Sequence, residues 1–460
     1  MDWDCNKTNH QEGPSPMLSQ HPGQRQAQAL AEQLQTFLSP LEQWLDAQLD
    51  KRLVRTFFLA LQAIVRFRHA RSGLLLSELG SHVLSPDKAP AGTKRLSNLL
   101  RSSRWSHTLL ARFLWMRADD KLQELQHEED ETALAIWDES VVEKPESIAL
   151  EGLCSVRSSK AARLKRIKPG YYSPPGGPPV FVPGMQWLTV MIAGMRGAPA
   201  LAVMRWWTTR GKRASDRITK ASALLAQCAR RWGRQVVHVF DRGFAGEPWL
   251  RQLTERQLRF IMRWPTRYRL EDSKGLRAAW KITRGKRSRD HRLLWDIHQH
   301  RYRKTGIVFV PVFHPAIDQQ LWLVVSRPGK GRKPWYLLTN EPILTTDDAW
   351  RIVMAYARRW QVEMCYRACK TDLAMESPRL WRWENRLKLL LMVSLVYAFL
   401  LSLVALTFKL LIEELLRRWC HRTGKRYREA AIPLSRIRAA LSALWTAHPP
   451  VFQVLQENSG

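Results

Sequence analysis

Acidic residues at separate places in the sequence have the chemistry of a shared metal site. Asp138 follows the apolar run LAIW, and Asp241 follows the apolar run VVHVF. Ligand sites in open α/β sheets gather at the carboxyl ends of strands, so two neighbouring strands would bring these carboxylates face to face. They would repel each other unless a proton or a metal ion lay between them, and hard carboxylate oxygens suit Mg²⁺. Alternatively, each Asp only begins a turn, since Asp is a favoured turn residue.

A third acid, Glu363, lies in the segment YARRWQVEMCYRACK. At roughly 100° per residue, one helix face would carry this single carboxylate together with a phenol and several cations: Tyr356, Arg359, Arg367 and Lys370. A surface helix would explain Arg359 and Glu363 as an ion pair worth only about 0.3–0.5 kcal/mol. Alternatively, the cations hold a phosphate while Glu363 reaches the metal ion.

The charge of the chain indicates a polyanionic partner. The 460 residues include 73 Lys and Arg against 41 Asp and Glu, a formal charge of +32. Nucleic acid is the partner that best neutralises such an excess, ahead of a membrane surface or an acidic protein, and 21 Trp offer rings that stack on bases. The segment GTKRLSNLLRSSRWSH predicts a short basic helix that contacts DNA through Arg95, Arg101 and Arg104. The alternative is a solvated helix between two core helices.

Two features bear on the compartment. The six Cys show no spacing suited to zinc, which indicates reduced thiols in a cytoplasmic protein, and the N-terminus has no charged-then-apolar start typical of a signal peptide. The apolar segment Leu389 to Phe408 is long enough to cross a bilayer. Because it is the only such segment and both of its ends are basic, we interpret it as a helix buried inside a large domain.

Hydrophobic periodicity divides the chain into regions. The fold class that we predict is α/β, a mixed sheet whose strand and helix order is interrupted by an insertion before a late helix. The expected regions are a mobile tail (1–27), a helical DNA-binding region (28–127), a catalytic core (128–265 and 345–412), a β-rich insertion (266–344) and a helical C-terminal region (413–460). Thr345 or Thr346 is the expected N-cap of the late helix.

The spacing of Tyr356, Arg359, Glu363 and Lys370 resembles the Y-x2-R-x3-E-x6-K signature of bacterial insertion-sequence transposases of the "insertion sequence four" type. The two Asp residues and the insertion lie where that family has them, and the resemblance covers roughly residues 130 to 410. It implies a ribonuclease-H-like core with an Asp-Asp-Glu metal triad, formed here by Asp138, Asp241 and Glu363. It also implies that Tyr356, Arg359 and Lys370 hold the phosphate of the transposon end.

Other matches to this family imply further DNA contacts. The segment DESVVEKP is similar to the D-x-[ST] start and makes Ser140 and Lys144 candidates. The segment DRGFAG is similar to a D-R turn and adds Arg242. The segment WYLLTNEP is similar to a W-x-L-L-T segment in a relative, where the Trp receives a base flipped out of the duplex, so the resemblance gives that role to Trp335.

The resemblance implies a DNA transposase that cuts transposon ends and joins them to target DNA by a cut-and-paste route through hairpin ends. Two Mg²⁺ ions, about 3.5–4 Å apart, would be held by the triad, with Mn²⁺ as an alternative ion. The implied partners are the terminal inverted repeats and target DNA, bound by a dimer, with the protein on the bacterial nucleoid and no membrane. Two alternatives stay open: a metal-dependent nuclease of the same fold and a basic DNA-binding protein without catalysis.

Overall fold

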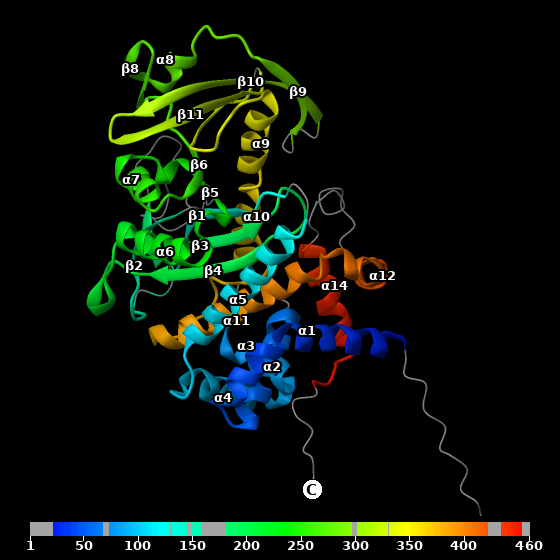
Figure 1. Ribbon diagram of the computed structural model, residues 1–460. Helices are drawn as coiled ribbons and strands as arrows, with labels where there is room; N and C mark the ends of the chain where they lie inside the picture. The colour runs from blue at the N-terminus through cyan, green and yellow to red at the C-terminus, as the bar shows by residue number, and fades with distance from the viewer. Residues whose placement is uncertain are drawn as a thin grey trace, which may run out of the picture.

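The computed structural model describes residues 22–452 apart from 68–72, 129–130, 145–146, 148, 159–179, 297–300, 330 and 422–433. Figure 1 shows helices from both ends of the chain packed together at one end of the molecule, a sheet with flanking helices in the middle, and long hairpins at the other end.

Five α-helices are described in the N-terminal region; their apolar faces pack into one core, and the second half of the fifth helix packs into the core of the sheet. They are α1 (Pro22–Asp46), α2 (Lys51–Arg66), α3 (Leu76–Val83), α4 (Ala89–Arg101) and α5 (His107–Gln126). The Asp50 carboxylate caps α2 by accepting the Leu53 N–H at 3.0 Å. The prediction of a tail up to residue 27 is wrong at its end, since α1 begins at Pro22 and buries Gln26 and Ala27.

The central sheet has the strand order of a ribonuclease-H-like core, β4-β3-β1-β5-β6. Its strands are β1 (Leu134–Glu143), β3 (Phe181–Ala193), β4 (Ala200–Trp207), β5 (Val237–Phe240) and β6 (Arg259–Arg263), and β2 (Cys154–Arg157) pairs with the start of β3. The strands β4, β3 and β1 are antiparallel, whereas β1, β5 and β6 run parallel. The helices α6 (Arg217–Trp232) and α7 (Glu247–Glu255) provide the crossovers that parallel strands require.

The predicted insertion is rich in strands and extends the same sheet. Its elements are β7 (Arg269–Asp272), β8 (Gly275–Ala278), α8 (Ala279–Thr283), β9 (Asp290–Asp296), β10 (Arg301–His314), β11 (Ile317–Arg327) and β12 (Trp335–Thr339). Strand β12 pairs with β6 at residues 261–263, so the described strands form one 12-stranded sheet.

The late helical segment is interrupted. Helix α9 (Thr346–Ala357) starts at the N-cap Thr345, which forms a reciprocal capping box with Asp348. Helix α10 (Trp360–Arg367) follows after a turn at residues 358–359, and the π-helical turn η6 (Ala368–Asp372) follows α10. The expectation of one regular helix from Tyr356 to Lys370 is therefore wrong. Tyr356, Glu363 and Lys370 belong to three consecutive helical pieces, and Arg359 lies in the turn between the first two.

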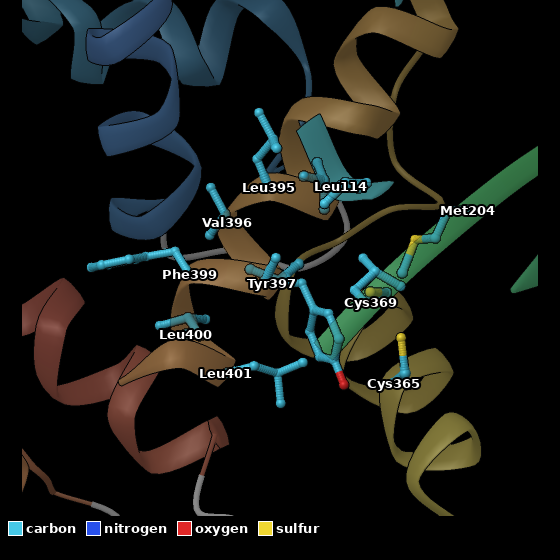
Figure 2. Packing of buried hydrophobic residues seen from close by; sticks show 14 of the residues in the cluster. Leu114, Met204, Cys365, Cys369, Leu395, Val396, Tyr397, Phe399, Leu400 and Leu401 are labelled. Carbon is cyan, nitrogen blue, oxygen red and sulfur yellow. The ribbon is translucent and has the colours of Figure 1, made fainter. Parts of the chain in front are cut away.

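The remaining helices close the core. Helix α11 (Trp383–Ser402) is long and apolar enough to span a bilayer, but 89% of its most apolar window is buried inside the protein. Figure 2 shows Tyr397 of α11 beside Cys365 and Cys369, where the α11 side chains fill the space behind the segment that carries Glu363. Helices α12 (Lys409–Trp419) and α14 (Leu434–Ala447) pack together beyond it.

Candidate active site

The first two acids stand at matching positions on neighbouring parallel strands. The pairing of β1 with β5 ends where Ile136 lies opposite Val239, and Asp138 and Asp241 each follow two residues later. The sequence prediction that Asp138 ends its strand is wrong. Strand β1 continues to Glu143 because it stays paired with β3, whereas β5 stops at Phe240. The longer strand thus carries Asp138 past the end of the shorter one.

Arg359 connects Asp138 with the third acid. Its Nη1 donates to Asp138 Oδ2 at 3.0 Å, and its Nη2 is paired with Glu363 Oε1. The Arg359 side chain is only 12% exposed. Burial lowers the pKa of Arg359, but Tyr356, Asp138 and Glu363 outweigh burial and raise its pKa above the ordinary value. The guanidinium is therefore a permanent cation between the two carboxylates.

The electrostatics favour a further positive charge near Asp138. Burial raises the pKa of Asp138 to about 7; Arg359 opposes this shift, and the carboxylates of Asp241 and Glu363 add to it. A divalent cation would relieve this repulsion, and the oxygen donors have the chemistry that Mg²⁺ prefers. Among the described residues, no three acidic, His or Cys side chains are already gathered around one metal position. The three carboxylates are the type of ligand that binds Mg²⁺. Two of them, Asp138 and Glu363, are paired with Arg359 in this structure.

Tyr356 and Lys370, the signature residues before and after Glu363, also lie close to the acidic site. The Tyr356 hydroxyl donates to Asp241 Oδ1 at 3.3 Å. The ring of Trp335 lies edge-on against the Tyr356 ring, with 5.1 Å between centroids. Lys370 Nζ donates to Ser140 Oγ at 2.9 Å, so this lysine reaches β1. The structure thus brings Tyr356, Trp335, Ser140 and Lys370 to the acids, although they come from different elements.

The remaining predicted DNA contacts fall into two groups. Lys144 is 1% exposed and donates to the backbone carbonyls of Pro378, at 2.6 Å, and Glu376. Its predicted contact with DNA is therefore wrong for this conformation, because the Lys144 ammonium is buried and donates to the carbonyls of a buried turn. The others have exposed side chains: Arg95, Arg101, Arg104, Arg242 and Arg367. Helix α4, which carries the first two, lies at the end of the molecule opposite the insertion (Figure 1).

Some residues that position the site have no clear signal in the sequence. The Tyr366 hydroxyl donates to the backbone carbonyl of Asp138, although its spacing on α10 is that of an ordinary core residue. Arg217 Nε donates to Glu139 Oε2 at 2.6 Å, and its Nη2 donates to the carbonyl of Gly243 at 2.9 Å. Arg217 thereby holds the turn after Asp241 against β1.

Comparison with known proteins finds one matching family model and similar solved structures. Residues 201–399 match a family model described as a transposase DDE domain, and this range includes Asp241 and Glu363 but begins after Asp138. Among solved structures, the chain is similar to a piggyBac transposase in a synaptic complex with hairpin DNA. The identity is 13% and the TM-score 0.41, over 87% of this chain and 72% of that chain. Residues 201–399 of this chain are therefore similar to a transposase DDE domain.

Proposed function

We propose that the protein is a DNA transposase that cleaves the ends of a mobile DNA segment and joins them to target DNA with the help of divalent metal ions. The observation that carries the proposal is that Arg359 binds both Asp138 and Glu363, while the charges of Asp241 and Glu363 act on Asp138. The transposase DDE domain over residues 201–399 supports the same reaction class. The narrower resemblance to transposases of the "insertion sequence four" type stays a prediction.

The acids are the proposed metal ligands. Asp138, Asp241 and Glu363 would together hold two divalent ions, Mg²⁺ or Mn²⁺. When bound, such ions supply Lewis-acid stabilisation of the attacking and leaving oxygens in phosphoryl transfer. For Glu363 and Asp138 to serve as ligands, the Arg359 guanidinium must leave them, and a DNA phosphate is the ligand that would attract it.

The neighbouring residues would hold the DNA end. Burial raises the pKa of Tyr356, so its phenol stays protonated at neutral pH and acts as a hydrogen-bond donor rather than as a nucleophile. Lys370 Nζ donates to the Ser140 hydroxyl at 2.9 Å and lies 3.9 Å from Glu376 Oε1, and it would turn from these partners to a phosphate oxygen when DNA binds. Both groups would fix the scissile phosphate beside the acids, which is the main contribution that a protein makes to phosphoryl transfer.

Further features of the reaction belong to the same proposal. The exposed cations Arg242 and Arg367, together with Arg95, Arg101 and Arg104 on and after α4, would contact the DNA backbone. The freed 3′-hydroxyl would attack the opposite strand to form a hairpin, which water reopens before strand transfer. Two subunits would hold the two inverted repeats, and the protein would work on the nucleoid of a bacterial cell.

The test uses end-labelled duplexes that carry the inverted repeats flanking the coding region. With Mg²⁺ and a target plasmid, the full-length protein should nick the 3′ end of the repeat and then give joined products. The matched control is Asp241→Asn, which should bind the same duplex without nicking it. Nicking without any joining would identify a nuclease. Binding without nicking by the wild-type chain would indicate a DNA-binding protein and refute the proposal.

A further inference from the structure

The backbone alone does not set the distance between the two acids that stand on neighbouring strands. In the described residues, the ladder between β1 and β5 ends where Ile136 lies opposite Val239. Asp138 and Asp241 lie beyond that end, where the ladder partner of β1 is β3 and the chain after β5 enters the turn η5 (Arg242–Phe244). Side-chain contacts must therefore hold the two carboxylates at a fixed separation.

Arg217, the first residue of α6, makes such a contact. Its Nε donates to the Glu139 carboxylate, at 2.8 Å from Oε1 and 2.6 Å from Oε2. Its Nη2 donates to the carbonyl of Gly243 at 2.9 Å, and its guanidinium carbon lies 4.7 Å from the centre of the Phe244 ring. One planar group thus ties β1 to the turn after β5, directly beside both acids.

Glu139 serves this contact rather than the acidic site itself. Consecutive residues of a strand point to opposite faces, and β1 keeps a regular register with β3 from Leu134 to Glu143. Glu139 therefore points away from the face that carries Asp138. The side chains of Arg217 and Glu139 are 43% and 25% exposed, and ion pairs of this kind contribute little to stability. The contact is therefore better explained by the geometry that it imposes than by the stability that it adds.

The separation of the acids bears on which ion they can hold. Mg²⁺ requires near-ideal octahedral geometry with oxygen ligands at about 2.0–2.1 Å, whereas Ca²⁺ accepts flexible geometry with oxygen ligands at about 2.3–2.6 Å. Carboxylates that are free to move apart would therefore lose affinity for Mg²⁺ before they lost affinity for Ca²⁺. Carboxylates at a fixed separation would keep the preference for Mg²⁺.

We propose that Arg217 fixes the distance between Asp138 and Asp241 and thereby makes the acidic site select Mg²⁺ over larger divalent ions. Arg217 is a positioning residue, because its described hydrogen bonds are to Glu139 and Gly243 and not to either acid. The inference rests on the proposed function, since it needs metal ions at these acids. It adds to that function the basis on which the site selects its ion.

The first test measures ion binding without any reaction. Full-length wild-type protein and the variant Arg217→Gln are saturated with a pre-cut duplex that ends at the inverted repeat, and each complex is titrated with Mg²⁺ and with Ca²⁺ in a calorimeter. The Mg²⁺ affinity of the variant should fall roughly 10- to 100-fold, the scale typical of residues that orient metal ligands, and its Ca²⁺ affinity should fall much less. An unchanged Mg²⁺ affinity, or an equal loss for both ions, would overturn the inference.

Arg231, at the other end of α6, provides a matched control. Its Nε lies 2.8 and 2.9 Å from the two carboxylate oxygens of Asp119, its guanidinium lies over the Trp115 ring, and its side chain is 41% exposed. In denaturant unfolding, Arg231→Gln should lower stability about as much as Arg217→Gln. The ratio of its Mg²⁺ and Ca²⁺ affinities should stay that of the wild type. The same change of this ratio in both variants would indicate a general loosening of α6 and contradict the inference.

A lysine at the same position separates charge from geometry. Arg217→Lys keeps the positive charge, but a single ammonium group lacks the planar fork that reaches Glu139 and Gly243 together. Its preference for Mg²⁺ should therefore be lost as in Arg217→Gln. If lysine restored the wild-type ratio of affinities, the charge of Arg217 and not the separation of the acids would account for the effect, and the inference would fall.

Nicking of the uncut repeat duplex separates the sources of failure. Arg217→Gln should need roughly 10 to 100 times more Mg²⁺ for half-maximal nicking, while its affinity for the duplex stays near that of the wild type. If the wild type binds Mg²⁺ but does not nick, the proposed function fails and the ratio of affinities still tests the contact. If the wild type nicks and the variant needs no more Mg²⁺, only the present inference fails. A wild-type complex that binds no Mg²⁺ would refute both.

Discussion

Two groups of buried or half-buried cations in this protein differ in what they bind. Lys144, Arg386 and Lys388 donate to backbone carbonyls, Lys388 to those of Leu100 and Ser102 at 3.1 and 2.7 Å. Arg359 and Lys370 instead bind side-chain oxygens. A carbonyl is fixed by the chain, whereas a carboxylate or hydroxyl can turn away.

The electrostatic surroundings of the two groups differ as well. Burial lowers the pKa of Arg386 to about 10, although the charge of Glu151 acts in the opposite direction. The carboxylates around Arg359 raise the pKa of that residue despite burial. The comparison teaches that the partner, rather than the residue type or its burial, distinguishes a structural cation from one that is able to change ligands during a reaction.

The largest effect is expected where the carboxylate itself is lost. Asp138→Asn keeps the shape of the side chain and its contact with Arg359 but removes the charge that a metal ion needs. Since metal assistance is worth several kcal/mol, nicking of the repeat duplex should fall by at least about a thousandfold, while gel-shift binding of the duplex stays. Nicking at the wild-type rate would remove Asp138 from the metal site.

One lysine from each group, Lys144 and Lys370, should separate an effect on stability from an effect on activity. Lys370→Met should slow nicking of saturated DNA by about 100-fold, the loss typical of one donor to a developing charge, with little change in the free energy of unfolding. Lys144→Met should do the opposite and lower that free energy by about 1–3 kcal/mol, since two carbonyls lose their donor. Denaturant unfolding and single-turnover nicking measure both quantities, and equal profiles for the two variants would contradict the distinction.

The bridging arginine should compete with metal ions. In Arg359→Gln the carboxylates lose a charge-assisted partner, so Mn²⁺ should bind the DNA-free protein about tenfold more tightly, as measured by calorimetry. The neighbouring Arg358 is a matched control, because it donates to the carbonyls of Gly194 and Gly197 at 2.9 and 2.6 Å. Arg358→Gln should leave the Mn²⁺ affinity unchanged. Unchanged affinity in both variants would show that Arg359 does not hold the metal position.

The exposed cations of α4 and the turn after it should give the smallest effect. Replacing Arg95, Arg101 and Arg104 by Gln should weaken DNA binding severalfold and reduce the slope of log K against log salt by about one unit per lost phosphate contact. Nicking at saturating DNA should not change. The salt dependence of binding provides the measurement, and an unaltered slope would favour a helix that is only solvated.

Local patterns in the sequence predicted much of this fold. Alternating and helical periods gave the order of the core strands and helices, and Thr345 was recognisable as an N-cap from its hydroxyl and the acids after it. The matching places of Asp138 and Asp241, each two residues after the last paired residues of β1 and β5, followed from two apolar runs that each precede an acid. These features depend on neighbours in the chain, which the sequence displays directly.

The errors came from partners that are remote in sequence. Strand β1 runs on past Asp138 because its later residues pair with β3, up to Glu143 opposite Gly184. Lys144 is a polar residue in a polar segment, and only the carbonyl of Pro378, 234 residues away, makes it a structural lysine. The late helix is interrupted at residues 358–359, where no Gly or Pro predicts a break.

The pairing of β12 with β6 has a consequence for how the chain is made. Strand β6 leaves the ribosome well before Trp335–Thr339, and until β12 arrives, the edge at Ile261 and Met262 has unpaired N–H and C=O groups. Open apolar edges recruit strands from other molecules. A truncated chain that ends within residues 266–334 should therefore aggregate through β6, so a shortened, soluble catalytic core would need a new edge strand in place of β12.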